Sequence, residues 1–470
     1  MSSKAPIPFS DPPALMGLPS PYFTPSHLNW AKAIRPFITK NLHSLAIESE
    51  QSPTATVPES VFSTFAKHHM LIPALPAPLP IAWLKKLGIH TLLGGLKVED
   101  FDSLHGYIYG DEMTRSGLAG PPGSLTTGIA FGLPLILKFG SAQLQERIVP
   151  DILLGSKRIC IAITEPEAGS DVAGIVTTAK KTPDGKHYII NGTKKWITNG
   201  IWSDYASMAV RTGPPGSGAA GISMLLVPLK NHPGVSMRRL KVAGQISAGT
   251  TFIELDDVKV PVANLIGKEN SGMKYIMTNF NHERLAVATG TTRQARVALS
   301  SAFEYVMKRE AFGKPLVEQP VVRHRLAKAG ALLESLTAWV EHFAYLMTRL
   351  PAEEADVKLG GLTALLKAQA GIVFKECADT AVLLFGGNGF TTTGQGMIAE
   401  SELFSFALFV FLMMVNYRAD WLYTVLYREV PGTRIPGGSE DVLLDLAVRQ
   451  LLKIYTIQTK MLEDAMIAKL

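Results

Sequence analysis

The sequence predicts an α+β fold, with an N-terminal helical domain, a central antiparallel β domain and a C-terminal helical bundle. Apolar residues recur at three- and four-residue steps before about residue 154 and again after residue 272, which is typical of amphipathic helices. Between these regions, short β-branched runs alternate with turn signals, which is typical of antiparallel strands. The 470 residues, 47% of them hydrophobic, are enough for a large core divided among several domains.

The domain boundaries are predicted where the hydrophobic pattern of the sequence changes. We expect a flexible N-terminus rich in Pro and Ser over residues 1–23, then helices, strands and helices over residues 24–157, 158–267 and 268–470. The helical period is clearest at 28–45, 61–70, 101–113, 273–308 and 321–350. The strands are predicted at 174–181, 188–196, 205–211, 223–228 and 251–260, with a turn at Asp184-Gly185.

An apolar insert near residues 397–426 interrupts the C-terminal bundle. It contains the run 403–415, which is too short to span a bilayer, so no transmembrane segment is expected. One interpretation is a lid or a membrane-touching element. The other is translated intron sequence in a mispredicted gene, which would leave a polypeptide that binds its cofactor poorly.

Composition excludes several classes of function. The net charge of +6 comes without a long Lys/Arg run or a basic stripe among aromatics, so nucleic acid is not an expected partner. The two cysteines, Cys160 and Cys377, form neither a disulfide framework nor a metal-ligand pattern, and we expect no metal site.

The residues at the two ends of the chain bear on the compartment in which the protein is found. The first 21 residues lack an apolar signal core and an Arg-rich amphipathic pattern, which argues against secretion and classical mitochondrial import. The C-terminal Ala468-Lys469-Leu470 differs by one residue from the peroxisomal Ser-Lys-Leu address. We therefore expect a peroxisomal protein, with the cytoplasm as the alternative.

Two segments of the β region carry the strongest functional signal. The first reads Ile163-Thr164-Glu165-Pro166-Glu167-Ala168-Gly169-Ser170-Asp171, and the second reads Trp196-Ile197-Thr198-Asn199-Gly200. Backbone N–H groups, hydroxyls and an aromatic face are what a planar, phosphate-bearing cofactor such as a flavin requires. The plainer interpretation is a pair of surface turns.

The order of helices, β domain and helices, with these two segments inside the β part, resembles the acyl-CoA dehydrogenase family. The resemblance implies FAD bound between the β domain and the C-terminal bundle of a homotetramer or homodimer, with a neighbouring subunit helping to hold it. It assigns Thr164 to the pyrimidine side of the flavin, Ser170 to the phosphate and substrate, Trp196 to the flavin stack, and Thr198 to N5.

Two later segments resemble further family motifs. Arg309-Glu310-Ala311-Phe312-Gly313-Lys314 resembles an Arg-x-x-Phe-Gly signature, in which Arg309 would reach the FAD pyrophosphate and Phe312 would pack on the cofactor. Gly386 and Gly387 begin a Gly-Gly-x-Gly turn whose backbone amides would approach the cofactor, although such a turn is often only a loop.

The resemblance also implies a catalytic base. One group of relatives carries a glutamate in a C-terminal Tyr-Glu-Gly-Thr segment, but the matching stretch, residues 435–440, has Pro436 at that place. A second group, with the isovaleryl and long-chain enzymes, carries it in a Glu-Arg-Leu context. The sequence Asn281-His282-Glu283-Arg284-Leu285 therefore indicates Glu283 as the base, with Arg284 beside the active site and Asn281 on the CoA arm.

The plainer interpretation of Glu283 is a solvated helix charge, and we expect His282 to be a satisfied surface residue. Pro436 also removes a backbone N–H where relatives polarise the thioester oxygen, so either Gly437 supplies the donor or the FAD ribityl hydroxyl does. Pro320 and Leu383 stand where relatives have glutamines that contact the adenosine half of FAD.

The resemblance implies an oxidoreductase of fatty acid metabolism that converts an acyl-CoA into a trans-2-enoyl thioester. Glu283 would take the proton, and flavin N5 would accept the hydride. The electron acceptor would be oxygen or an electron-transfer flavoprotein. One alternative is a flavin oxidase of a small acidic-carbon substrate such as a nitroalkane, and another is a catalytically inactive homologue. Acyl chain length and branching, and CoA or carrier attachment, are left open.

Overall fold

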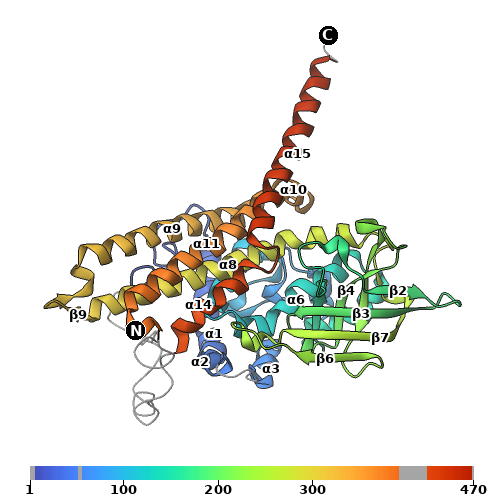
Figure 1. Ribbon diagram of the computed structural model, residues 1–470, viewed down its shortest axis with the longest axis horizontal. Helices are drawn as coiled ribbons and strands as arrows, with labels where there is room; N and C mark the ends of the chain where they lie inside the picture. Colours follow the sequence, from blue (N-terminus) through green and yellow to red (C-terminus); the bar gives the residue numbers. More distant parts are fainter. Residues whose placement is uncertain (1–5, 51–55, 391–420, 468–470) are drawn as a thin grey trace.

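The structure is a computed structural model that describes residues 6–50, 56–390 and 421–467 (Figure 1). It confirms the predicted order of an N-terminal helical region, a central β domain and C-terminal helices. The domain boundaries themselves stay predictions. The N-terminal region contains α1 (Pro25–Ile38), α2 (Ser44–Ala46), α3 (Glu59–Lys67), α4 (Ile81–Lys86), α5 (Ser103–Met113), α6 (Gly120–Phe139) and α7 (Ala142–Leu153).

Side-chain caps fix where two of these helices begin. The Asp102 carboxylate accepts hydrogen bonds from the backbone N–H groups of Leu104 and His105, both at 3.0 Å, and so starts α5. The Ser141 hydroxyl accepts a hydrogen bond from the Leu144 N–H at 3.2 Å and starts α7. Caps of this kind satisfy N–H groups that have no partner within the helix.

The segment before α1 is tied into the core by charge. Asp11 is buried and accepts hydrogen bonds from Arg115 at 2.5 and 3.0 Å and from Arg35 at 3.0 Å. Arg293, far along the chain, also pairs with Asp11 and donates to the Ser10 carbonyl oxygen. Residues 6–23, predicted as part of a flexible N-terminus, therefore lie against the helices in the structure.

The β domain is one eight-stranded sheet. Its strands are β1 (Ile159–Ala162), β2 (Thr178–Lys181), β3 (His187–Ile197), β4 (Tyr205–Arg211), β5 (Ile222–Pro228), β6 (Val235–Arg239), β7 (Thr251–Pro261) and β8 (Leu265–Ile266). They run in the order β6-β7-β3-β2-β4-β5-β8, with β1 on β4. Most pairs are antiparallel as predicted, but β1 and β2 each pair with β4 in parallel.

The C-terminal helices are long, and α8, α9 and α11 lie side by side (Figure 1). This region contains α8 (Gly272–Lys308), β9 (Glu310–Ala311), β10 (Lys314–Pro315), α9 (Pro320–Arg349), α10 (Ala352–Lys358), α11 (Gly360–Phe385), α12 (Gly387–Phe390), α14 (Trp421–Arg434) and α15 (Glu440–Ile467). The predicted apolar insert near 397–426 lies outside the described residues up to position 420. Within the described ranges, no helix is both long and apolar enough to cross a membrane.

Two glycines seat α6 directly on the β domain. A Cβ added at Gly128 would lie 1.9 Å from the Ile159 carbonyl oxygen, and one at Gly132 would lie 2.9 Å from that of Cys160. Only glycine permits so close an approach of helix and strand. This contact fixes the N-terminal helices against the sheet that carries the predicted flavin segments.

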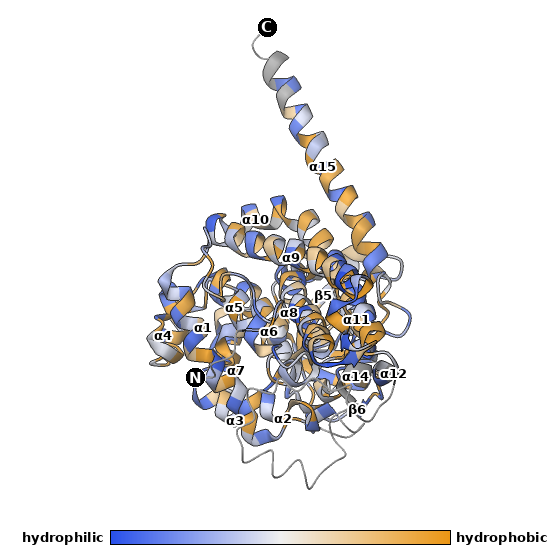
Figure 2. Cartoon of the chain, turned by 90° about the vertical axis from the view of Figure 1, so that its left-hand side faces the viewer, coloured by the Kyte–Doolittle hydropathy of each residue, from blue (hydrophilic) through white to orange (hydrophobic). Residues whose placement is uncertain are grey.

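The last helix, α15, leaves the body of the molecule (Figure 1), and apolar turns alternate with hydrophilic ones along it (Figure 2). It carries large apolar side chains that are 37 to 68% exposed, namely Val442, Leu444, Val448, Leu451, Leu452, Tyr455, Ile457 and Met461. A stripe of this kind is unusual on a helix that only contacts water.

Candidate active site

The two β-domain segments that were predicted to contact a flavin lie side by side. The backbone N–H of Lys195 donates to the Thr164 carbonyl oxygen at 3.0 Å. The Lys194 ammonium donates to the Ile163 carbonyl oxygen at 2.9 Å and to Glu165 at 2.8 Å. Segments some 30 positions apart in the sequence therefore form one surface, as a shared cofactor site requires.

The ion pair between Lys194 and Glu165 is buried, with both side chains at most 2% exposed. The Glu165 carboxylate also accepts hydrogen bonds from the backbone N–H groups of Val176 and Thr177. Burial lowers the pKa of Lys194 to about 8, although Glu165 acts in the opposite direction. The pair acts as a rigid clamp under the cofactor segments, because each charge has its partner and the carboxylate has further donors.

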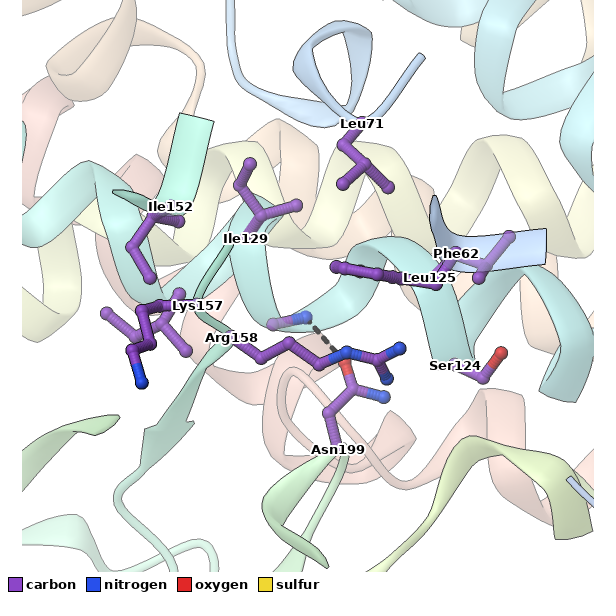
Figure 3. Close-up of a pocket in the computed structure, with 11 residues that line it drawn as sticks. Phe62, Leu71, Ser124, Leu125, Ile129, Ile152, Lys157, Arg158 and Asn199 are labelled. Carbon is purple, nitrogen blue, oxygen red and sulfur yellow. Dashed lines mark hydrogen bonds between the residues drawn. The ribbon is translucent and has the colours of Figure 1, made fainter. Parts of the chain in front are cut away.

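Trp196 presents its ring to solvent from an unusual backbone. Its φ of 59° lies in the left-handed region, and 48% of the side chain is exposed. Asn199, with a φ of 64°, holds the following turn, because its Oδ1 accepts a hydrogen bond from the Gly128 N–H at 2.7 Å (Figure 3). Left-handed backbone is costly for a bulky residue and is characteristic of functional sites.

The groups on this surface fit a flavin. Thr164 and Thr198 are half-buried, Ser170 is exposed, and all three hydroxyls belong to the clamped segments beside the Trp196 ring. An exposed aromatic face with hydroxyl donors matches a planar ring system that carries heteroatoms and phosphate. The assignment of Thr164, Ser170, Trp196 and Thr198 to the cofactor stays a prediction, with which this exposure is compatible.

Glu283 lies on α8, and one oxygen of its carboxylate is shielded from water. Its Oε2 is buried and has no hydrogen-bond partner among the described residues. Burial raises the pKa of Glu283 to about 7, while the charges of Arg284 and Lys367 act to lower it. A carboxylate with a pKa near neutral pH is suited to proton abstraction. The prediction of a solvated helix charge is thus not supported.

Arg284 and a glycine turn border this carboxylate. Arg284 is 4% exposed and its Nε donates to the Gly437 carbonyl oxygen at 3.2 Å. A Cβ added at Gly437 would lie 3.9 Å from Glu283 Oε1, so the turn passes close to this carboxylate. Among the residues that the structure describes, the Gly437 N–H has no protein acceptor, which leaves it available to a substrate oxygen.

The two residues before Glu283 differ in their surroundings. Asn281 is 7% exposed and faces Gly360 at the start of α11. The expectation of a satisfied surface histidine at position 282 does not hold for Nε2, which is buried and has no hydrogen-bond partner among the described residues. Burial lowers the pKa of His282 to about 4, so its ring is neutral near Phe131.

The remaining predicted cofactor residues lie elsewhere in the molecule. Arg309 and Phe312 follow α8, and Phe312 is 92% exposed with a φ of 56°. Gly386 and Gly387 are exposed. They lie near the end of α8, because the adjacent Asn388 donates a hydrogen bond of 3.1 Å to Tyr305 there. These four residues form a second group near the end of α8, because both Arg309 and Asn388 bond to Tyr305.

A small pocket between α3, α6, α7 and β1 is a different feature (Figure 3). Leu71 and Ile129 lie on its apolar side, while Arg158 and Lys157 lie opposite. None of the residues predicted to bind cofactor or substrate lines it. The pocket therefore does not mark the predicted site.

Three side chains with metal-ligating atoms also lie together in the described part of the chain, namely His27, Asp102 and His105. The Thr24 N–H donates to His27 Nδ1 at 2.9 Å, so Nε2 carries the proton and donates to Asp102 at 3.1 Å. A nitrogen that carries a proton is not a metal ligand. The cluster acts as paired caps for α1 and α5.

The structure thus presents a carboxyl group suited to proton abstraction on α8 and an exposed aromatic side chain on the β domain, a combination compatible with an oxidoreductase. The chain also matches two family models, the acyl-CoA dehydrogenase middle domain over residues 160–258 and the acyl-CoA dehydrogenase C-terminal domain over residues 270–452. It belongs to the acyl-CoA dehydrogenase family, whose members depend on FAD.

Individual relatives agree over nearly the whole chain. The sequence is 61% identical to acyl-CoA dehydrogenase apdG of Emericella nidulans, over 99% of this chain and 100% of that one. It is 32% identical to acyl-CoA dehydrogenase AFT10-1 of Alternaria alternata, over 94% and 95% of the two chains. The crystal structure of an acyl-CoA dehydrogenase from Geobacillus kaustophilus superposes with a TM-score of 0.74 at 26% identity, covering 92% of this chain and 100% of that one.

Proposed function

We propose that the chain carries out FAD-dependent α,β-dehydrogenation of an acyl-CoA thioester to a trans-2-enoyl thioester, with Glu283 as the base. The observation that carries the proposal is the Oε2 of Glu283, which is buried without a partner in the described part of the chain and lies near Arg284 and the Gly437 turn. Membership of the acyl-CoA dehydrogenase family supports the reaction type.

In the proposed reaction Glu283 takes the proton on the carbon α to the thioester carbonyl. The Gly437 N–H would donate to the thioester oxygen, on which negative charge develops. FAD, when bound, would supply the two-electron oxidant for the hydride that leaves the β carbon, with flavin N5 as the accepting atom. Trp196 and Thr198 would hold the flavin ring, Thr164 its pyrimidine side, and Ser170 the phosphate and substrate.

The test is anaerobic bleaching of the FAD-loaded protein by a panel of acyl-CoA thioesters of different length and branching. We expect bleaching and an enoyl product, and the panel reports the preferred acyl group. Oxygen consumption with a nitroalkane and no bleaching by any thioester would favour the oxidase alternative. A protein that stays colourless after FAD addition would favour the inactive homologue. Reoxidation by oxygen or by an electron-transfer flavoprotein then identifies the acceptor.

The rate of bleaching should depend on pH through Glu283. Because burial raises the pKa of this carboxyl to about 7, it is protonated and inactive as a base below that pH. We expect the rate to rise with pH through a midpoint about 7, measured by stopped-flow absorbance. A rate that is constant between about pH 5 and pH 9 would contradict this assignment.

We further propose that two copies complete each FAD site in a homodimer or homotetramer. The loop after Trp196 bonds to the neighbouring loop through Asn199 and Ala248. That neighbouring loop meets α8 through Glu429, which accepts hydrogen bonds from the Gln245 N–H and the Gln294 side chain. The flavin segments therefore reach α8 near its middle.

Arg309, by contrast, follows the end of α8, and about 22 Å of helix at about 1.5 Å per residue separates it from Gln294. The pyrophosphate of FAD lies only a ribityl chain away from the flavin ring. Arg309, Phe312, Gly386 and Gly387 are thus placed to serve the cofactor of a neighbouring subunit, rather than that of their own.

The exposed stripe on α15 supplies a contact for such an assembly. A second copy that covers this stripe would bury apolar area worth about 25 cal/mol per Å². We expect the double substitution Val448→Glu and Leu452→Glu to lower the oligomeric state, measured by light scattering. Substitution of the exposed, charged Arg449 and Lys453 by Glu is the matched control. Equal masses for all variants would contradict this role of α15.

We propose peroxisomal targeting by Ala468-Lys469-Leu470, which lies outside the described residues, with the cytoplasm as the alternative. A free C-terminal tripeptide is what the targeting receptor reads. A fluorescent protein fused before residue 1 should enter peroxisomes, and one fused after residue 470 should not. Participation in fatty acid metabolism is part of the same proposal and depends on the acyl group that the thioester panel identifies.

A further inference from the structure

Lys367 is a buried cation in an apolar part of α11. It is 1% exposed, and its neighbours Leu366 and Ala368 are buried as well. Leaving an ammonium out of water is costly unless it is paired or fully hydrogen-bonded. The mechanism described above does not use this residue, so the cost requires an explanation.

The ammonium of Lys367 is bonded to the glycine turn that borders the base. Its Nζ donates to the carbonyl oxygens of Arg434 at 3.0 Å and Gly438 at 2.8 Å, which lie on either side of Gly437. The turn takes left-handed backbone at both glycines, with φ of 69° at Gly437 and 103° at Gly438. Lys367 therefore ties α11 to the same turn that Arg284 holds from α8.

The charges of two cations favour the ionised form of Glu283, namely Arg284 on its own helix and Lys367 on α11. The adjacent His282 is neutral because burial lowers its pKa. Lys367 in turn faces Arg284 and Arg434, which disfavour its charge, and Glu283 and Glu440, which favour it. Burial is the largest of these influences and lowers the pKa of Lys367 to about 8.

We propose that Lys367 is a positioning residue for proton abstraction, which fixes the Gly437 turn against Glu283 and supplies a positive charge facing that base. This inference rests on the proposed function of Glu283 as the base. Arg284 is already committed to the Gly437 carbonyl oxygen, so it does not replace Lys367 on the α11 side of the carboxylate.

The two parts of the role are separable by substitution. Lys367→Gln keeps a donor for the carbonyl oxygens but removes the charge, Lys367→Met removes both, and Lys367→Arg keeps both. An opposite charge at close range lowers a carboxyl pKa by about 1–3 units. Its removal should therefore raise the pKa of Glu283 in the first two variants, while arginine should restore the parent value.

The first measurement is the titration of the Glu283 carboxyl by ¹³C NMR of glutamate-labelled, FAD-loaded protein, with the signal assigned by its loss in Glu283→Gln. We expect the midpoint to move up by about 1–2 pH units in Lys367→Gln and Lys367→Met. The second measurement is the pH profile of flavin bleaching, which should fall roughly 5- to 50-fold at pH 7 and recover at high pH.

Lys375→Met is the matched control, because Lys375 lies on the same helix but is exposed and paired with Asp379. It should leave both profiles unchanged. Midpoints in Lys367→Gln equal to those of the parent would overturn the proposal and leave Lys367 a structural residue only. If Lys367→Met does not fold, the glutamine and arginine variants still decide. Because the carboxyl titration needs no turnover, failure of the proposed dehydrogenation is distinguishable from failure of this inference.

Discussion

Replacement of Glu283 by glutamine should abolish flavin bleaching by any acyl-CoA while FAD stays bound. The amide is close in size to the carboxylate but does not accept the α proton. Positioned general bases contribute about 10²–10⁴ to the rate, so we expect a loss of that order. The measurement is anaerobic stopped-flow absorbance at saturating thioester, with the flavin content of each preparation determined beforehand.

The matched control for this variant is Glu304→Gln. Glu304 lies on the same helix, α8, and pairs with Lys308 on the surface of the helix. It should bleach at the parent rate, since its carboxylate is far along α8 from the glycine turn. Parent-like bleaching in Glu283→Gln would remove Glu283 as the base. Parent-like bleaching would also undermine the role proposed for Lys367.

Substitution of Lys194 by methionine should lower the free energy of unfolding of the protein far more than substitution of an exposed lysine of the same sheet. It leaves the Glu165 carboxylate buried with its backbone donors but without a counter-charge. Removal of one member of a buried pair costs about 3–5 kcal/mol. We expect that drop in the free energy of unfolding from urea titrations, together with weaker FAD retention, because Lys194 also holds the Ile163 carbonyl.

The double variant Lys194→Met with Glu165→Gln separates the charge effect from the packing effect. It should recover part of the loss, since no unpaired charge is then buried. Lys180→Met in β2, where the side chain is exposed, serves as the control and should change stability little. A loss in Lys194→Met no larger than that in Lys180→Met would show that the clamp is not a major stabilising feature.

The local pattern of the sequence was sufficient for much of the fold. β4 occupies the predicted residues 205–211, and α8 differs from the prediction by one residue at its start. β6 was missed because Val235–Arg239 is nowhere fully buried and so shows no apolar run. The parallel pairing of β1 with β4 could not be read from the sequence, since pairing between distant strands depends on the whole sheet.

The candidate site was likewise predicted only in part from the sequence. Short motifs were enough to propose Glu283, Arg284 and Trp196, because their chemistry lies in neighbouring residues. Lys367 was missed, since its ammonium group is hydrogen-bonded by the turn 434–438, which lies far along the chain. The sequence shows a lysine inside an apolar helical segment, but this pattern does not predict which groups the lysine contacts. Nothing in the sequence showed that the predicted cofactor residues fall into two separate groups.

The salt bridge between Asp11 and Arg293 also has a consequence for the order in which the protein folds. The two residues are 282 positions apart, so this contact forms only after α8 has been made, whereas Arg35 and Arg115 can pair with Asp11 much earlier. At about 5–20 residues per second, a ribosome needs roughly 15–60 s to add the intervening chain. A nascent chain that stalls before α8 therefore lacks the Arg293 side chain that joins Asp11 and Asp111 to the C-terminal bundle, and its helical domain is left without that cover.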